Sequence, residues 1–299
     1  MRILVLGGTR FVGRALVDQA VSRGHDVSTF TRGSHGEPRP GAEALHGDRT
    51  RPQDLAALAT RDWDAVIDAS VIAPVHVAAS AGLLAGHAGQ YTYLSSLAVY
   101  IAAAGTPVTE DSPVWDCPAT AADSQETLGY GPLKAGSERA VAAAFPGRHL
   151  IVRPGVLAGP HDDGGALPWW LARLARGGRV PVPGEPGTPV RLIDARDLSA
   201  WVVDSIRRGI AGTVNVPGPR GHTLGELLSA CLSVTGVSGG EPAELAWTPG
   251  DRALAADVPG LGSGWDASGE RAALAGLRYR PLADTVRDTW SWLLQAACR

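Results

Sequence analysis

Short runs of apolar, mostly β-branched residues alternate with alanine-rich segments through the first half of the chain. The apolar runs lie at Ile3–Leu6, Val27–Phe30, Ala65–Asp68 and Tyr91–Leu94, and segments with helical spacing separate them at Phe11–Ser22, Pro52–Ala59 and Pro74–Ala85. A further helix at Pro132–Ala144 leads to the apolar strand "HLIVRP". Strands that are buried on both faces and separated by helices form a parallel sheet with right-handed crossovers. The pattern therefore predicts an α/β fold of the Rossmann type, with a doubly wound parallel sheet.

The alternation loosens after about residue 155. The stretch from Gly159 to Pro189 predicts a loop, a helix and a Pro/Gly-rich segment, and "VRLIDARDLSAWVVDSI" predicts a strand, a turn and a helix. A short strand in "TVNVPG" and helices at Leu224–Val234 and Pro281–Ala297 follow. We expect a larger domain at residues 1–155, joined by about 190–217, and a smaller α+β region at 156–189 and 218–299.

Charge and composition narrow the class of partner. The 299 residues carry a formal charge of −3 without a block of like charges, which argues against nucleic acid or an anionic membrane surface as the partner. No apolar stretch approaches the about 18 residues that a membrane span needs. Cys117, Cys231 and Cys298 lie far apart without CxxC spacing, so we expect neither a disulfide framework nor a metal site, and a reducing, cytoplasmic location.

A glycine-rich segment, "GGTRFVG" at residues 7–13, directly follows the first strand and opens the first helix. Gly7 permits a tight turn, Gly8 lets the backbone approach a pyrophosphate, and Gly13 lets the helix pack on the strand. The helix N-terminus offers N–H groups and partial positive charge to the phosphates. The predicted cofactor contacts are Gly7, Gly8, Thr9, Arg10, Phe11, Val12, Gly13, Arg32, Asp48, Ala69, Ser70, Tyr130, Lys134, Pro154 and Gly155.

The end of the second strand indicates which dinucleotide binds. This strand ends in Thr31 and Arg32, without the carboxylate that would bind the ribose 2′-hydroxyl of NAD, and Arg10 lies inside the glycine loop. Two guanidinium groups suit a 2′-phosphate, so we predict NADP rather than NAD, although Arg32 could simply be a solvated strand end. Asp48 is placed to accept a hydrogen bond from adenine, or else to cap the helix that starts at Pro52.

A tyrosine and a lysine one helical turn apart supply candidate chemistry. Lys134 is the only lysine among 27 basic residues, and it follows Tyr130 by four positions. An ammonium group beside a phenol lowers the phenol's pKa, so that the tyrosine can exchange a proton with an alcohol or carbonyl. Ser95 and Ser96 end the preceding strand, where a hydroxyl can bind the reacting oxygen or cap a turn.

Five motifs in this order, "GGTRFVG", "SSLAVY", "YGPLKAGSE", "IVRPGVLAGP" and "RLIDARDLSA", resemble the short-chain dehydrogenase/reductase superfamily. The resemblance is to the extended or atypical branch, which holds nucleotide-sugar epimerases, dehydratases and related reductases, and it covers nearly the whole chain. It implies hydride transfer at the nicotinamide, with Tyr130 as general acid/base, Ser96 as the catalytic serine, and Lys134 binding the nicotinamide ribose. It also implies that residues 1–155 bind NAD(P) and that the C-terminal region binds the substrate.

The chain departs from that branch at residues expected to bind a substrate. Val156 stands where nucleotide-sugar enzymes place an asparagine for the diphosphate, and Thr248 stands where a second arginine is expected, whereas Arg191 matches. A valine cannot donate a hydrogen bond to a phosphate, so a UDP- or dTDP-sugar is disfavoured. Ser95, Val156, His161 and Arg191 remain the candidate substrate contacts.

Two groups of acidic residues near these positions are predicted to have structural rather than metal-binding or catalytic roles. The loop "GPHDD" is more typical of a solvated loop than of a metal site. Asp194 and Asp197 are predicted to be a turn and a helix cap.

Three functions are consistent with these residues. The first is an NADP-dependent reductase or dehydrogenase that acts on a small, non-nucleotide carbonyl or alcohol through Ser96, Tyr130 and Lys134. The second is an epimerase or dehydratase, in which bound cofactor takes hydride and returns it within one turnover. The third is a non-catalytic nucleotide-sensing or RNA-associated protein. A monomer or a homodimer is expected.

Overall fold

The computed structural model describes residues 1–34, 36, 39–102, 106–236, 241–250 and 266–298. The contacts between Cα atoms divide the chain into two compact units. Unit 1 comprises residues 1–154, 198–217 and 264–278, and unit 2 comprises residues 155–197, 218–263 and 279–299. Each unit is therefore built from segments that are far apart in the sequence.

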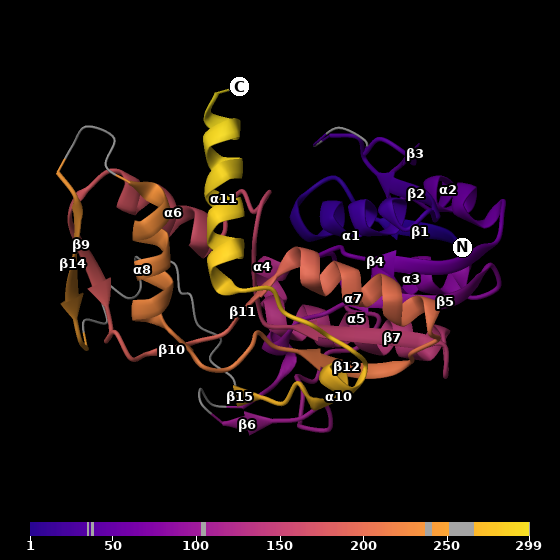
Figure 1. Ribbon diagram of the computed structural model, residues 1–299. Coiled ribbons are helices and arrows are strands. Elements are labelled where there is room, and N and C mark those ends of the chain that lie inside the picture. The colour runs from indigo at the N-terminus through magenta and orange to yellow at the C-terminus, as the bar shows by residue number, and fades with distance from the viewer. Residues whose placement is uncertain (35, 37–38, 103–105, 237–240, 251–265, 299) are drawn as a thin grey trace. The chain divides into compact units, whose positions relative to one another are not determined.

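A seven-stranded parallel sheet forms the centre of unit 1 (Figure 1), in the order β12-β7-β5-β4-β1-β2-β3. Its strands are β1 (Arg2–Leu6), β2 (Asp26–Thr31), β3 (Ala42–His46), β4 (Trp63–Asp68), β5 (Ala88–Leu94), β7 (His149–Pro154) and β12 (Gly212–Val216). Every neighbouring pair is parallel. Most side chains of β1 and β4 are buried, which explains their continuous apolar runs. The predicted Rossmann-type fold class is confirmed.

Helices connect the strands of unit 1. They are α1 (Phe11–Ser22), α2 (Pro52–Ala56) with the 3₁₀ helix η1 (Ala57–Ala59), α3 (Pro74–Leu84), η2 (Leu97–Val99), α4 (Gln125–Leu128), α5 (Tyr130–Ala144), α7 (Ala195–Arg207) and α10 (Glu270–Leu274). The first three residues of α7 belong to unit 2. A two-stranded parallel pair joins β6 (Pro107–Val108) to β15 (Asp266–Ala267). Figure 1 shows α10 beside β12, with which it packs.

A core cluster of unit 1 lies between the sheet and the packed helices α3 and α5. Tyr91 and Phe145, both fully buried, pack with their ring centroids 5.1 Å apart. This aromatic pair therefore serves the core, because large rings bury much apolar area per residue.

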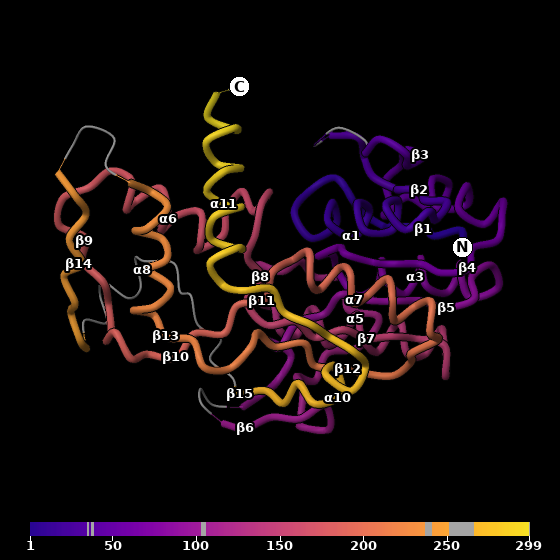
Figure 2. Tube along the Cα trace, viewed as in Figure 1, coloured from indigo at the N-terminus to yellow at the C-terminus, as the bar shows by residue number. Residues whose placement is uncertain are grey.

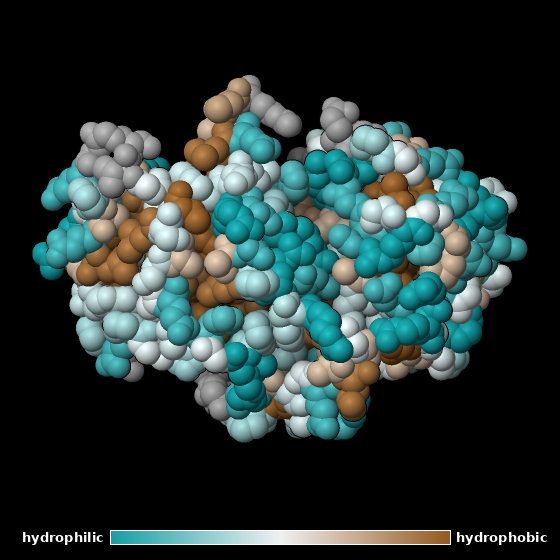
Figure 3. Space-filling model, viewed as in Figure 1, coloured by the Kyte–Doolittle hydropathy of each residue, from teal (hydrophilic) through white to brown (hydrophobic). Residues whose placement is uncertain are grey.

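In the described residues, unit 2 combines three two-stranded sheets with three helices (Figure 2). The strands pair as β8 (Val156–Ala158) with β11 (Leu192–Asp194), β9 (Gly178–Pro183) with β14 (Ala243–Thr248), and β10 (Pro189–Val190) with β13 (His222–Thr223). The helices α6 (Ala166–Ala175), α8 (Leu224–Thr235) and α11 (Leu282–Ala297) contact one another around an apolar core. In Figure 3, apolar residues also reach the surface over α8 and β14, where Leu245 and Trp247 are only partly buried.

A capping box starts helix α8. The Thr223 hydroxyl accepts a hydrogen bond from the Glu226 amide at 3.2 Å, and the Glu226 carboxylate accepts one from the Thr223 amide at 3.0 Å. These two bonds satisfy amide groups that a helix N-terminus would otherwise leave without partners.

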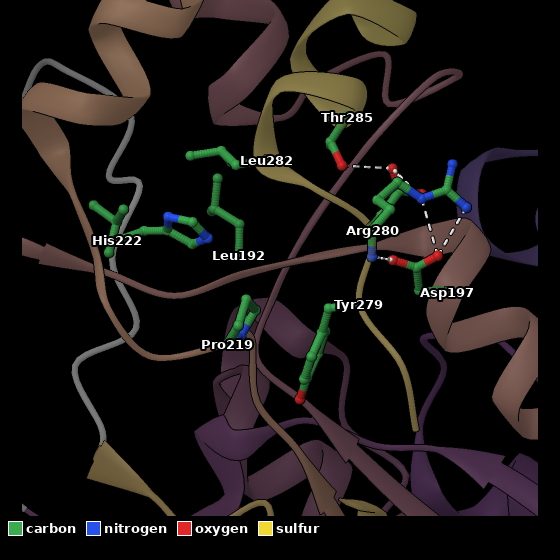
Figure 4. Close-up of a pocket in the computed structure, with 10 residues that line it drawn as sticks. Leu192, Asp197, Pro219, His222, Tyr279, Arg280, Leu282 and Thr285 are labelled. Atoms are coloured by element: carbon green, nitrogen blue, oxygen red, sulfur yellow. Dashed lines mark hydrogen bonds and ion pairs between the residues drawn. The ribbon is translucent and has the colours of Figure 1, made fainter. Parts of the chain in front are cut away.

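Asp194 and Asp197 take part in an ion-pair network of unit 2 that sequence analysis did not predict. Asp194 accepts the Arg196 amide at 2.8 Å, as a helix cap does, and also binds the Arg196 guanidinium and the Thr285 hydroxyl. Asp197, in contrast, lies inside the first turn of α7 and binds Arg280 at 2.8 Å (Figure 4). The predicted cap at Asp197 is therefore wrong, and Asp194, predicted to be a turn residue, accepts the cap-like bond instead.

We expect Asp194→Asn to lower the free energy of unfolding of unit 2 by about 2 kcal/mol, because the buried Asp194 carboxylate loses its charge-assisted bonds to the half-buried Arg196 and Arg280. Asp288→Asn, which breaks a more exposed pair with Arg196, should cost less than about 1 kcal/mol. Urea denaturation followed by circular dichroism measures both.

Burial raises the pKa of Asp194, but Arg196 and Arg280 lower it more, so the net pKa is depressed. The contribution of the Asp194 carboxylate to the free energy of unfolding is therefore lost as the pH falls through that pKa. The difference in free energy of unfolding between the wild type and Asp194→Asn should accordingly shrink in acid. Equal losses for both variants at neutral pH would contradict this account.

Candidate functional site

A cavity of about 650 Å³ opens at the carboxyl ends of strands in unit 1. Its lining contains most of the residues predicted to contact a cofactor, namely Gly7, Gly8, Thr9, Arg10, Phe11, Val12, Gly13, Arg32, Asp48, Ala69 and Ser70. Phe30, Thr31, Gly33, Ser34, Gly47, Arg49, Thr50, Val71 and Ile72 complete it. These residues form four segments, 7–13, 30–34, 47–50 and 69–72, at the carboxyl ends of β1, β2, β3 and β4. The segments meet because parallel strands end at a common edge of the sheet. The contact of each residue with a cofactor stays a prediction.

The glycine loop has the backbone that a pyrophosphate cradle requires. Gly7 and Gly8 have φ angles of +106° and +107°, in the region that side chains other than glycine rarely adopt. A Cβ atom on Gly13 would come within 2.8 Å of the Gly8 amide nitrogen. The N-cap residue Arg10 makes no side-chain hydrogen bond to the start of α1. A dinucleotide fits this cradle, because the close backbone approach and the first amides of α1 suit a diphosphate.

Asp48 lines this cavity in the segment that follows β3. Its Oδ1 accepts hydrogen bonds from the Thr50 amide at 2.9 Å and the Thr50 hydroxyl at 2.8 Å, which hold the Asp48 pKa below its ordinary value. The N-cap of α2 is Arg51, and it makes no side-chain cap. The alternative that Asp48 caps α2 is therefore wrong, and the adenine contact stays a prediction.

Lys134 is buried in unit 1, with 2% of its surface exposed. Its Nζ donates to the carbonyl oxygens of Ser70 at 3.0 Å and Leu94 at 2.6 Å, at the ends of β4 and β5. The ammonium lies 4.7 Å from the ring centroid of Tyr93 and 5.9 Å from that of Tyr130. Burial lowers the Lys134 pKa to about 8, and nearby carboxylates oppose that shift.

Tyr130 starts helix α5, directly after Gly129 with φ of +83°. The helix thus begins two residues before Pro132, where sequence analysis placed its start. Tyr130 keeps 38% of its surface exposed. Burial raises its pKa above the ordinary value, and its hydrogen bond with Ser96 only partly offsets this. The net shift is therefore opposite to the lowering of the Tyr130 pKa that sequence analysis expects.

The two serines after β5 have different environments. The Ser96 hydroxyl accepts a hydrogen bond from the Ala98 amide at 3.1 Å and caps η2, as the capping alternative predicted, while also contacting Tyr130. Ser95 is 3% exposed and donates to the Glu138 carboxylate. Ser96 and Tyr130 are therefore neighbours, whereas the Ser95 hydroxyl is already engaged inside the protein.

Sequence analysis missed Arg49 and Asp68. The Arg49 guanidinium binds both oxygens of the Asp68 carboxylate, at 2.9 and 2.8 Å, and Asp68 is fully buried. Arg49 also lines the cavity. An aspartate at the end of an otherwise apolar central strand was the available signal, because a buried carboxylate needs a charged or hydrogen-bonding partner.

The remaining substrate candidates belong to unit 2. Val156 lies in β8, and His161, with φ of +70°, packs on Trp292 with ring centroids 5.4 Å apart. Arg191 Nε donates to the Gly218 carbonyl at 3.1 Å, and the Thr248 hydroxyl donates to the Val182 carbonyl at 3.1 Å. Pro154 ends the first segment of unit 1, and Gly155 begins unit 2.

A small cavity of about 20 Å³ in unit 2 is lined by Val190, Leu192, Asp194, Asp197, Pro219, His222, Tyr279, Arg280, Leu282 and Thr285 (Figure 4). Val156, His161 and Arg191 are not among its lining residues. This volume suits about one water molecule, so the cavity in this form does not hold a sugar.

Within the ranges that the structure describes, no three or more His, Cys, Asp or Glu side chains are grouped to hold a metal ion. In the same ranges, no helix combines the length and apolar character needed to cross a membrane.

Comparison with known proteins decides the family. The model of the NAD-dependent epimerase/dehydratase family matches residues 3–216. The chain belongs to this family. The resemblance to the extended branch of short-chain dehydrogenases is thereby confirmed, and the family is one of NAD(P)-dependent enzymes.

Individual relatives add detail. The dTDP-6-deoxy-L-talose 4-dehydrogenase (NAD(P)⁺) of Kitasatospora kifunensis is 27% identical, over 97% of this chain and 95% of its own. The chloroplast stem-loop binding protein of 41 kDa b from Arabidopsis thaliana is 26% identical, over 79% of this chain and 63% of its own. The structure of Thermus thermophilus UDP-glucose 4-epimerase in complex with NAD has a TM-score of 0.75, with 17% identity, and covers 99% of this chain and 100% of that one.

These comparisons change the order of the predicted functions. They favour the epimerase/dehydratase alternative over the carbonyl reductase that sequence analysis placed first. They do not specifically support NADP, since the solved relative holds NAD.

Gly13→Ala should weaken dinucleotide binding by at least about tenfold, because the new Cβ would displace the Gly8 amide from the cradle. Calorimetric titration with NADPH and with NADH measures the effect. The matched control is Gly82→Ala in α3, where an added Cβ meets no atom within 4 Å, so binding should not change. Unchanged affinity in Gly13→Ala would mean that the loop does not hold the pyrophosphate.

Proposed function

We propose that the protein is an NAD(P)-dependent oxidoreductase that acts at a secondary alcohol or ketone carbon of a sugar, either as a dehydrogenase or within an epimerisation. One observation carries the proposal: the Lys134 ammonium donates to the carbonyl of Ser70, which lines the dinucleotide cavity, and Tyr130 lies one turn away with its side chain partly exposed. The family and its sugar-dehydrogenase relative support a sugar as the substrate class.

In the proposed mechanism, Tyr130 transfers the proton between its phenol and the substrate oxygen. Ser96, already in contact with Tyr130, donates a hydrogen bond to the same oxygen. The bound nicotinamide supplies or accepts the hydride. The raised Tyr130 pKa leaves a neutral phenol at neutral pH in the free protein, which suits donation of a proton to a ketone. For alcohol oxidation the phenol must first lose its proton, so that direction should speed up as the pH rises.

We further propose NADP as the preferred cofactor. Arg10, Arg32 and Ser34 line the cavity, and Asp48 is the one carboxylate among its described lining residues. Asp48 is engaged with Thr50, so the lining offers guanidinium groups for a 2′-phosphate.

A second candidate is a reductase of a small, non-nucleotide carbonyl compound. Val156 and the Thr248 hydroxyl, which is bonded to a backbone carbonyl, favour it, because neither is a strong phosphate ligand. A third candidate, an RNA-associated role, draws only on the relative that the chain matches over 63% of its length.

Tyr130→Phe should reduce kcat/KM by at least about a hundredfold while leaving the Kd for dinucleotide unchanged, because only proton transfer is lost. One assay follows the formation of reduced nicotinamide during oxidation of dTDP-6-deoxy-L-talose. A separate assay follows the epimerisation of UDP-glucose by the formation of its 4-epimer. Ser22→Ala, at the exposed end of α1, is the control. Turnover of simple ketones but of neither sugar would favour the second candidate. Wild-type activity in Tyr130→Phe would refute the catalytic assignment.

Arg32→Ser should weaken NADPH binding by about tenfold or more and leave NADH binding nearly unchanged, because only NADPH carries the 2′-phosphate. Competition titrations of both dinucleotides measure this selectivity. Arg61→Ser removes a surface arginine that binds Glu43 outside the cavity, and it should affect neither dinucleotide. Equal losses for NADPH and NADH in Arg32→Ser would contradict the NADP assignment.

A further inference from the structure

A buried ion pair connects the dinucleotide cavity with the ammonium group of Lys134. Arg49 lines the cavity but is only 9% exposed, and its two terminal nitrogens bind the two oxygens of Asp68. The Tyr91 hydroxyl donates to the same carboxylate at 2.8 Å. Taking two charges out of water is costly, so a pair in this position calls for an explanation beyond stability.

Asp68 reaches Lys134 through a single residue. The Asp68 Oδ1 accepts hydrogen bonds from the amide of Ser70, at 3.0 Å, and from its hydroxyl. The carbonyl of Ser70 in turn accepts the hydrogen bond from Lys134 Nζ. The carboxylate thus fixes the turn after β4 whose carbonyl holds the ammonium.

The charges around Lys134 act in opposite directions. The carboxylates of Asp68 and Glu138 raise the Lys134 pKa, whereas burial and the Arg49 guanidinium lower it. The titratable and charged groups that face the ammonium are Asp68 at the end of β4, Arg49 after β3, Tyr93 on β5, and Tyr130 and Glu138 on α5. Of these, Arg49 and Asp68 are bound to each other, so each limits the effect of the other.

We propose that Arg49 and Asp68 are positioning residues for Lys134: Asp68 fixes the carbonyl that holds the ammonium and supplies the negative charge that keeps it protonated, and Arg49 moderates that charge. The consequence for the reaction rests on the proposed function, in which Lys134 lies one helical turn from Tyr130 and binds the Ser70 carbonyl at the dinucleotide cavity. The effect on Lys134 itself is a property of the free protein and is measured without substrate.

The single lysine makes a direct measurement possible. Protein grown with ¹³C,¹⁵N-lysine carries one labelled side chain, and the ¹³Cε shift of Lys134 is followed against pH. Asp68→Asn should lower the Lys134 pKa by about one unit or more, since a nearby opposite charge is removed. Arg49→Gln should raise it, and Arg49→Gln/Asp68→Asn should fall between the two single variants. Asp18→Asn, in the surface pair with Arg39, should leave it unchanged.

A merely structural pair predicts a different result, because loosening the site from either side would move the pKa in one direction or not at all. Shifts of the same sign in both single variants, or no shift in either, would overturn the proposal. If Asp68→Asn does not fold, as judged by circular dichroism, Arg49→Gln and the double variant still test the proposal. A Lys134 pKa that is lowered in Arg49→Gln refutes it. A Lys134 pKa that is higher in the double variant than in Arg49→Gln also refutes it.

The same variants separate this proposal from the proposed function. If the Lys134 pKa moves as expected while Lys134→Met retains full sugar oxidoreductase activity, the positioning role stands and the catalytic function fails. If Lys134→Met is inactive but the two charge variants leave the pKa unmoved, the reverse holds.

Discussion

The ammonium group of Lys134 binds the carbonyl of Ser70, just after β4, and the carbonyl of Leu94, at the end of the neighbouring β5. A buried lysine loses its hydration, so it stays charged only if hydrogen-bond acceptors and negative charge replace the water. The two carbonyls supply the acceptors, and Asp68 and Glu138 supply the charge. An arginine could not take this place, since its planar fork of five donors would leave several of them without acceptors.

Buried charge elsewhere in unit 1 follows the same rule. Arg153 and Glu138, each about 5% exposed, form a two-pronged pair, and the Tyr100 hydroxyl accepts from Arg153 at 2.8 Å. Ser95 donates to the same carboxylate. Glu138 therefore serves two purposes, as the counter-charge of Arg153 and as part of the field around Lys134. Its engagement also explains why Ser95, despite its position beside Ser96, is poorly placed to bind a substrate.

The proposed chemistry and the proposed substrate class depend on different parts of the chain. The dinucleotide cavity and the Tyr130–Lys134 pair belong to unit 1, and the family match covers residues 3–216. The positions that depart from nucleotide-sugar enzymes, Val156 and Thr248, belong to unit 2. The dTDP-sugar dehydrogenase relative thus supports the proposed sugar substrate, while these two side chains support the second candidate, a small non-nucleotide carbonyl compound.

The sequence by itself determined the fold class, the glycine cradle and the spacing of Tyr130 and Lys134, because these depend on local patterns: strand and helix periods, backbone freedom at glycine, and one helical turn. It could not show that Lys134 points at Ser70 and Leu94, or that Arg49 pairs with Asp68. Those contacts join residues up to 64 positions apart, and only the sheet order brings their strand ends together. For the same reason the Tyr130 pKa was predicted in the wrong direction: spacing gives the distance between two side chains, but burial and competing hydrogen bonds decide which form of the phenol is stable.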